Sequence, residues 1–343
     1  KKIAFFCVLN SVRQKRGIFM KTKEFINELL TSAISSKASD IFFFPKKETM
    51  VVQFRTNQGV ITQTDLSLNE GQETINFFKY SAQMDIAEHR RPQVGAMAYE
   101  VDQKEYYLRL SSLGDFSDQE SLVIRIIYEI KQSKYFFPQQ IESLERSALH
   151  RGLIVTSGPT GSGKTTTMYE VAKKLSPNKV VMTIEDPVEV HEPTFLQSQV
   201  NNEAGIDYQS LLKAALRHRP DILIIGEIRD QGTARLAVDA ALSGHLVFAT
   251  VHAKSTLQTI SRLESLGIKN DELANCLTAV SYQRLLPSAV GMQCLMDIAK
   301  GELLNQELQL SVRSDFVNWQ ENMQLLRKGG KIDDEIYEQF KEG

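Results

Sequence analysis

The fold is decided by one stretch of the sequence, Gly158-Pro159-Thr160-Gly161-Ser162-Gly163-Lys164-Thr165-Thr166. It follows the pattern of a phosphate-binding loop, in which glycines let backbone N–H groups turn inward around phosphate oxygens. An apolar run (153–155) precedes the loop, and a helix-compatible run (166–172) follows it. That helix would point the positive end of its dipole at the same phosphates. We therefore predict that residues 158–166 bind a nucleotide, with Lys164 at the β- and γ-phosphates and the Thr165 hydroxyl on Mg²⁺.

Composition places the chain among ordinary globular proteins. Its 343 residues suggest two domains, each long enough to bury a core. A net charge of −2 gives the whole chain no attraction to nucleic acid or to an anionic membrane. No apolar run approaches the length of a membrane-spanning helix. Three widely spaced cysteines, Cys7, Cys276 and Cys294, suit a reducing cytosol and form no zinc pattern.

The amino-terminal residues have an unusual composition. Lys1-Lys2 and the apolar run 3–9 resemble the start of a signal peptide, but the run is short and the basic segment 13–16 follows without a cleavage site. We predict that translation naturally begins at Met20 and that residues 1–19 are an upstream or non-native extension. The alternative is an amphipathic arm that docks on a partner.

Residues 20–130 predict a small α+β domain. Helical spacing of apolar residues marks 20–37 and 72–83. Alternating apolar runs with Pro, Asn and Gly at the turns predict strands at 41–44, 49–55, 60–64, 96–101, 105–111 and 121–130. A linker is expected over 131–151, a range that includes Pro138.

From Gly152 onward, strands and helices alternate. Apolar runs at 153–156, 180–184, 222–225 and 246–250 are separated by helical stretches, which is typical of a parallel sheet with helices on both faces. Ligands in such α/β folds bind at the carboxyl ends of the strands. We predict a nucleotide-binding domain over 152–300 and a mainly helical segment over 301–343.

Charged residues follow two of these strands. Glu185 and Asp186 end the run 180–184 and could hold Mg²⁺ and a water molecule. Glu227 follows the run 222–225 and could act as a general base, polarise the attacking water or bind the metal through water. Asp230 is expected to cap the next helix.

Two histidines bracket the last of these runs. His252 follows it on the phosphate side, where it could sense the γ-phosphate, and His245 precedes it. An extended strand of this length spans roughly 23 Å, so the two side chains cannot share one metal ion.

In this order and spacing, the segments 158–167, 183–189, 217–230 and 243–253 resemble the Walker A, Asp box, Walker B and His box of the ATPases that drive type II secretion and type IV pili. Residues 38–41, 54–55, 109–113 and 122–127 resemble the amino-terminal domain of the same family. The resemblance covers about residues 22–300. It implies a RecA-like core with a small PAS-like α+β domain before it. The chain resembles the compact competence members in particular, because it lacks the extra amino-terminal domain and the four-cysteine segment, so no zinc site is expected near Gln283-Arg284-Leu285-Leu286.

The resemblance also implies a role for particular residues. Arg109 and Arg125 correspond to arginine fingers, and a guanidinium fork suits the charge of a transferring phosphoryl group. With Glu227, Glu185 and His252 they form the expected catalytic set, and Thr165, Glu185 and Glu227 the expected Mg²⁺ set. The sequence does not divide metal binding and water activation between the two glutamates.

The family further implies a homo-hexamer that hydrolyses ATP in the cytoplasm, at the inner face of the membrane. Its partners would be a polytopic platform protein and, indirectly, pilins, with no direct contact to nucleic acid even where the outcome is DNA uptake. Extension and retraction of a pilus both remain open. A DNA-translocating motor and a nucleotide switch without useful turnover are the alternatives from other classes.

Overall fold

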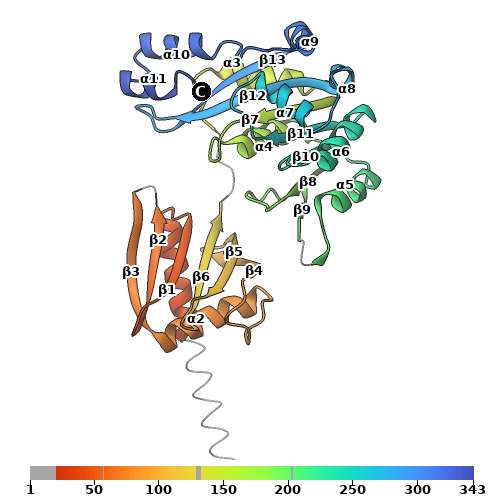
Figure 1. The fold of residues 1–343 in the computed structure, drawn as a ribbon. Coiled ribbons are helices and arrows are strands. Elements are labelled where there is room, and N and C mark those ends of the chain that lie inside the picture. The colour runs from red at the N-terminus through yellow and green to blue at the C-terminus, as the bar shows by residue number, and fades with distance from the viewer. Residues whose placement is uncertain (1–20, 57, 129–132, 202–203) are drawn as a thin grey trace, which may run out of the picture. The chain divides into compact units, whose positions relative to one another are not determined.

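The computed structural model describes residues 21–56, 58–128, 133–201 and 204–343. The chain divides after Tyr128 into two compact units, a small one and a large one (Figure 1). The predicted extension, residues 1–19, lies outside the described residues.

The small unit is built on a six-stranded antiparallel sheet in the order β3-β2-β1-β6-β5-β4. Its strands are β1 (Asp40–Pro45), β2 (Thr49–Thr56), β3 (Gly59–Ser67), β4 (Gln93–Val101), β5 (Lys104–Gly114) and β6 (Glu120–Ile127). All six begin or end within a few residues of the predicted strands. The pairing of β2 with β3 shifts register at Val52/Gln53.

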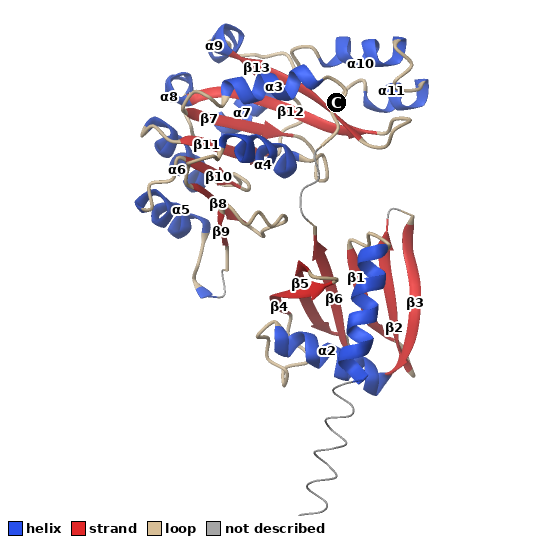
Figure 2. Cartoon of the chain, turned by 180° about the vertical axis from the view of Figure 1, so that it is seen from behind, coloured by secondary structure: helices blue, strands red, loops and turns tan. Residues whose placement is uncertain are grey.

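Two helices complete the small unit, one over residues 21–35 and α2 (Leu68–Ser81). Ser67 caps α2 through a capping box with Glu70, which fixes where the helix begins. Both helices lie on one face of the sheet (Figure 2). Their apolar side chains share a core with the alternate strand residues that point to that face. The core comprises, among others, Ile26, Leu30, Phe43, Phe54, Ile75, Phe78, Leu110 and Ile124.

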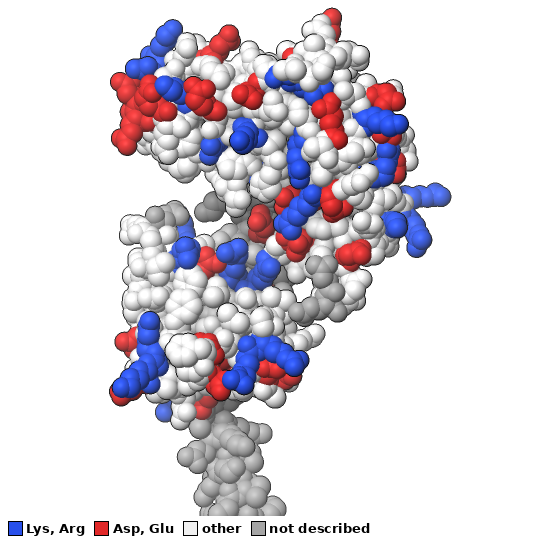
Figure 3. Space-filling view, in the orientation of Figure 1, with Lys and Arg blue, Asp and Glu red and all other residues white. Residues whose placement is uncertain are grey.

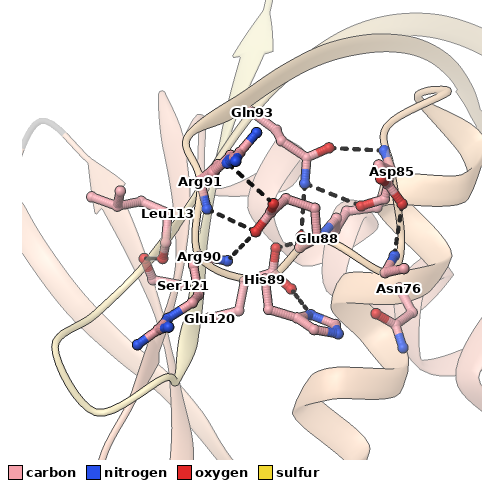
Figure 4. A network of polar contacts seen from close by, with 12 residues as sticks. Asn76, Asp85, Glu88, His89, Arg90, Arg91, Gln93, Leu113, Glu120 and Ser121 are labelled. Carbon is pink, nitrogen blue, oxygen red and sulfur yellow. Dashed lines mark hydrogen bonds and ion pairs between the residues drawn. The ribbon is translucent and has the colours of Figure 1, made fainter.

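A buried ion pair fixes the loop between α2 and β4. Lys79 is fully buried, and its Nζ donates to Glu120 Oε1 at 2.6 Å and to the Glu88 carbonyl at 2.7 Å. The Gln93 side chain in turn donates to the Glu88 carbonyl and accepts from the Asp85 N–H (Figure 4), so side chains help to tie the loop to the sheet. His89 completes the network with Nδ1 at 2.9 Å from Glu120 Oε2.

The large unit is a seven-stranded sheet in the order β13-β12-β7-β11-β10-β8-β9. All neighbours are parallel except the edge pair β12 and β13. The strands are β7 (Gly152–Ser157), β8 (Val181–Glu185), β9 (Leu196–Gln199), β10 (Ile222–Ile225), β11 (Leu246–Val251), β12 (Leu277–Leu286) and β13 (Gln293–Lys300). The predicted RecA-like arrangement therefore carries one antiparallel strand that the sequence did not indicate.

Helices cover both faces of this sheet. They are α3 (Pro138–Ser147), α4 (Lys164–Leu175), α5 (Tyr208–Arg217), α6 (Gln231–Leu242), α7 (Gln258–Ser265), α8 (Asn270–Cys276) and α9 (Gly301–Leu308). Residues of α3 and α4 share one core, and residues of α5 to α9 share the other. Beyond them, α10 (Trp319–Lys328) and α11 (Asp334–Phe340) pack with Tyr282 and Leu286 of β12.

One predicted boundary needs correction. The range 131–151 was expected to be a linker, but residues 138–147 form α3, and Ile141 and Leu144 are buried in the core of the large unit. Pro138 does not interrupt a structure there; it occupies the first turn of the helix, where its missing N–H costs nothing. Residues 131 and 132 lie outside the described residues.

We predict that Lys79→Met destabilises the small unit by roughly 3–5 kcal/mol, because it leaves the Glu120 carboxylate buried without its cation. Unfolding by denaturant should be followed by circular dichroism and by fluorescence of Trp319, the single tryptophan, which lies in the large unit. The midpoint of the unfolding transition followed by Trp319 fluorescence should not change, because it reports on the large unit. Exposed Lys47→Met is the control, and a loss below about 1 kcal/mol in the small unit would contradict the prediction.

Candidate active site

The phosphate loop lies between fully buried β7 and the first turn of α4. Gly158, Gly161 and Gly163 all have positive φ, at 138°, 78° and 84°. Gly163 is the N-cap of α4 and offers no side chain to the helix. The N–H groups of the first helical turn are therefore left for a ligand, as an anion site at a helix N-terminus requires.

Lys164 lies back over its own loop. Its Nζ donates to the carbonyls of Gly158 and Pro159, each at 2.9 Å. Partial burial lowers the pKa of Lys164, against the opposing attraction of Glu227 and Glu189. The ammonium group is thus held at the loop and faces two carboxylates across the site.

A cavity of about 440 Å³ opens beside the loop, at the carboxyl ends of β8, β10 and β11. Of the residues predicted from sequence, it is lined by Thr160, Gly161, Gly163, Lys164, Thr165, Thr166, Glu185, Glu227 and His252. Gly158, Pro159 and Ser162 shape the loop but do not line the cavity. Asp186, which was predicted together with Glu185 as a possible Mg²⁺ group, also lines the cavity. The lining residues that were not predicted from the sequence are Pro187, Glu189, Tyr208, Gly226, Arg229, Thr250 and Leu285.

Glu227 stands at the centre of the charged groups in this cavity. Its Oε1 lies 3.2 Å from His252 Nε2, and its Oε2 accepts from Arg229 Nε at 2.7 Å. Arg229 also reaches Asp186 at 3.1 Å. The structure thus brings Glu227 and His252 together from the ends of neighbouring strands, and Arg229 links them to the turn after β8.

Glu185 has a different environment from Glu227. It is 2% exposed and accepts hydrogen bonds from the Tyr169 hydroxyl and from Thr183 Oγ1, the latter at 2.6 Å. Burial raises the pKa of Glu185, and the two hydroxyl donors act against that shift. Glu185 therefore lines the cavity, but its carboxylate is shielded from solvent.

Two side-chain oxygen donors lie beside the phosphate loop, where Mg²⁺ would bind. Thr165 Oγ1 donates to Glu189 Oε2 at 3.3 Å, at the start of α4 beside the loop. Within the described ranges, no group of three or more His, Cys, Asp or Glu side chains is placed to hold a metal. A hydroxyl and a carboxylate next to a phosphate site fit Mg²⁺, which usually takes few protein ligands and keeps water and phosphate oxygens.

Arg109 and Arg125 belong to the small unit, whereas the other predicted site residues belong to the large one. They face each other across β5 and β6, and Arg125 pairs in turn with Asp40 of β1. Arg125 Nε donates to Asp40 Oδ1 at 2.8 Å, and Arg55 lies 3.6 Å from the other oxygen. Residues opposite one another share a face, so three arginines and one buried aspartate form a row across the sheet.

The remaining predictions near the site have simple outcomes. Asp230 caps α6 by accepting from the Thr233 N–H at 2.9 Å, as predicted. His245 precedes β11 at the end of the strand opposite to His252, and its Nδ1 lies 2.9 Å from the Ala240 carbonyl. Glu189 and Arg229 were not predicted to belong to the site. Both lie within the motif segments, close in sequence to Glu185 and Glu227, and that position was the signal that could have indicated them.

Comparison with known proteins agrees with the predicted family and fold. The protein family described as "Type II/IV secretion system protein" matches residues 19–319. The chain is 40% identical over 310 residues to competence protein ComGA of Streptococcus pneumoniae, covering 90% of this chain and 95% of that protein. It is 38% identical over 268 residues to ComGA of Bacillus subtilis, covering 76% and 75%.

The chain therefore belongs to the type II/IV secretion system protein family. The solved structure of the pilus retraction motor PilT with bound ADP superposes with a TM-score of 0.74 at 22% identity, covering 92% of this chain and 96% of that one. This likeness shows the fold. The predicted family, its RecA-like core and its ATPase class are confirmed.

We predict that Gly158→Ala abolishes nucleotide binding whereas Gly161→Ala weakens it only moderately. A Cβ at Gly158 would lie 2.4 Å from the Gln283 carbonyl oxygen, whereas a Cβ at Gly161 meets nothing within 4 Å. Both positions have positive φ, so each substitution introduces backbone strain of about 1–3 kcal/mol. The two variants differ in the steric clash, which only Gly158→Ala creates. Equilibrium binding of a fluorescent ATP analogue checks this. Equal losses of affinity would contradict it.

Proposed function

We propose that this protein is the motor ATPase of a competence-type pilus machine, which hydrolyses ATP to drive assembly of the fibre. One observation carries the proposal. The phosphate loop and the Glu227–His252 pair meet in a single cavity at the carboxyl ends of the strands. Hydrolysis of ATP requires at least a loop that binds the triphosphate and a nearby carboxylate that can orient the attacking water.

The two glutamates are assigned different tasks. Glu227 is partly solvated and lies beside His252, so it is the group that orients and deprotonates the attacking water. Glu185 is buried against Tyr169 and Thr183 and fixes the end of β8 next to the cavity. Its raised pKa makes it the weaker candidate for binding Mg²⁺ directly.

Thr165 and Glu189 are the side chains that would hold Mg²⁺. When bound, the ion neutralises charge on the β- and γ-phosphates. Lys164 binds the same phosphates, for which it must leave the carbonyls of Gly158 and Pro159. His252, which lies against Glu227, then responds to the presence of the γ-phosphate.

Arg109 and Arg125 supply the second half of the site in this proposal. Their guanidinium groups neutralise charge that develops on the transferring phosphoryl group when the small unit closes over a nucleotide. Asp40 holds Arg125 in one orientation. Release of phosphate frees the small unit to move against the core, and a homo-hexameric ring turns this movement into mechanical work.

The proposed partners follow from the similarity in sequence to the competence proteins. A polytopic platform protein of the membrane receives the movement, and pilin subunits are lifted into the fibre indirectly. The protein would act in the cytoplasm, at the inner face of the membrane. Within the described residues, each helix is too short or too polar to cross a bilayer. The structural likeness to a retraction motor favours pilus retraction as the second candidate.

A direct role in moving DNA is less well supported. Such a motor needs a basic lining that neutralises several phosphates. The chain has a net charge of −2, and charges of both signs are interspersed on the face shown in Figure 3. We therefore place DNA uptake downstream of the pilus and not on this protein.

We predict that Glu227→Gln lowers kcat by about 10²–10⁴-fold and leaves the affinity for ATP nearly unchanged, because it removes a general base but keeps the shape of the site. Glu185→Gln should lower kcat by less than about tenfold, since an amide resembles the protonated acid that burial favours. Steady-state phosphate release and titration calorimetry measure both quantities. A fully active Glu227→Gln variant would remove Glu227 from the mechanism.

We predict that Arg109→Ala and Arg125→Ala each lower kcat by roughly 10³-fold or more while ATP still binds, and that Arg125→Lys does not restore turnover. The control is Arg90→Ala, which changes an exposed arginine of the same unit that pairs with Asp118. Turnover should be measured at saturating ATP. If Arg90→Ala were as damaging as the other two changes, the finger assignment would fail.

A further inference from the structure

Gln283 of β12 carries a buried amide directly beneath the phosphate loop. The side chain is fully buried, and its Nε2 donates to the Ser162 carbonyl at 2.7 Å. No function has so far been assigned to Gln283.

The backbone of the loop packs closely against this strand. Tyr282 of β12 pairs with Ser157 of β7, so Gln283 lies level with the point at which the loop begins. A Cβ on Gly158 would approach the Gln283 carbonyl oxygen to 2.4 Å, and a Cβ on Gly163 would approach Gln283 Nε2 to 3.3 Å. Residues at both ends of the loop thus contact Gln283.

Two polar atoms at this contact are buried without partners among the described residues. They are Oε1 of Gln283 and Oγ of Ser162. Buried polar atoms in folded proteins are nearly always paired, and an unpaired one is costly. Gln283 and Ser162 are already joined by the bond from the Gln283 side chain to the Ser162 backbone carbonyl. The amide oxygen of the first and the hydroxyl group of the second are both left over, which points to a second arrangement of the loop in which they pair.

Anchoring the Ser162 carbonyl also orients the next amide. The peptide group is planar and trans, so its C=O and N–H point in opposite directions. When Gln283 holds the Ser162 carbonyl from behind the loop, the N–H of Gly163 is turned away from β12. This is the orientation that a phosphate-binding amide of the loop needs.

We propose that Gln283 is a positioning residue of the phosphate loop: its amide N–H holds the Ser162 carbonyl so that the loop presents its N–H groups to the phosphates, and its Oε1 accepts the Ser162 hydroxyl when a nucleotide is bound. The inference rests on the proposed ATPase function. Gln283 does not line the nucleotide cavity, so it acts through the loop and not on the substrate.

Two substitutions test the inference on the full-length chain. Gln283→Met keeps the length of the side chain and removes both hydrogen bonds, and we expect the Kd and KM for ATP with Mg²⁺ to rise about tenfold or more, with little change in kcat. The matched control is Ser281→Ala on the same strand. Ser281 is as buried, but its hydroxyl donates to Thr156 of β7, before the loop begins. The control should bind ATP like the wild type.

The pH dependence of ATP binding by Gln283→Glu distinguishes a hydrogen-bonding role of Gln283 from a role in packing alone. A protonated carboxyl group can donate to the Ser162 carbonyl, whereas a carboxylate cannot. The affinity of Gln283→Glu relative to the wild type should therefore recover as the pH is lowered from about 8 to about 6, because burial favours the protonated acid. The same ratio for Gln283→Met should not change with pH.

The outcomes separate the inference from the proposed function. If the wild type binds ATP and Gln283→Met binds it equally well, or if Ser281→Ala is equally damaging, the positioning role is wrong. A pH-independent ratio for Gln283→Glu would also overturn it, and this variant decides the matter if Gln283→Met does not fold. Failure of the wild type itself to bind ATP would instead overturn the proposed function.

Discussion

The site depends on one constraint: several backbone N–H groups must point inward at the same phosphates. Such a loop needs left-handed backbone at Gly158, Gly161 and Gly163, and no side chain can occupy the first of these positions without striking β12. A backbone so unusual persists only where its surroundings hold it. Here they are β7, buried along its whole length, and the first turn of α4, whose free N–H groups extend the same cradle. The parallel sheet is therefore the support that makes the loop possible.

The same edge of the sheet collects the charged groups, because parallel strands end together. Glu227 follows β10 and His252 follows β11, and adjacent strands place their side chains within 3.2 Å. Arg229 and Asp186 extend this network sideways. A cation at the loop and carboxylates opposite it leave the cavity with groups of both signs, which suits a polyanionic substrate that must be bound and then attacked by water. The small unit carries its own row of arginines, in which the buried Asp40 accepts from Arg125 and lies 3.6 Å from Arg55.

The sequence predicted the loop, the four central strands and the residues at their ends, because these parts follow from local patterns. It missed β12 because Gln283 and Arg284 interrupt the apolar run that would have marked a buried strand. Pro138 was wrongly placed in a linker. In a sequence, a proline in the first turn of a helix cannot be told from one in a linker, and only the burial of Ile141 and Leu144 in the core shows that this segment is a helix. The burial of Glu185 could not be foreseen, since its partner Tyr169 lies on α4 and only the fold brings the two together.

The two faces of β12 connect the carboxyl-terminal helices to the phosphate loop. Because successive strand residues point in opposite directions, Gln283 and Leu285 face the loop whereas Tyr282 and Leu286 enter the cluster formed by α10 and α11. Tyr282 packs edge-on against Trp319, with ring centroids 5.3 Å apart, and against Phe316 at 5.4 Å. Aromatic rings packed on one face of β12 oppose displacement of the strand away from the phosphate loop, which lies on its other face. The helices at 319–340 hold none of the predicted site residues, yet they pack on the strand that contacts the phosphate loop.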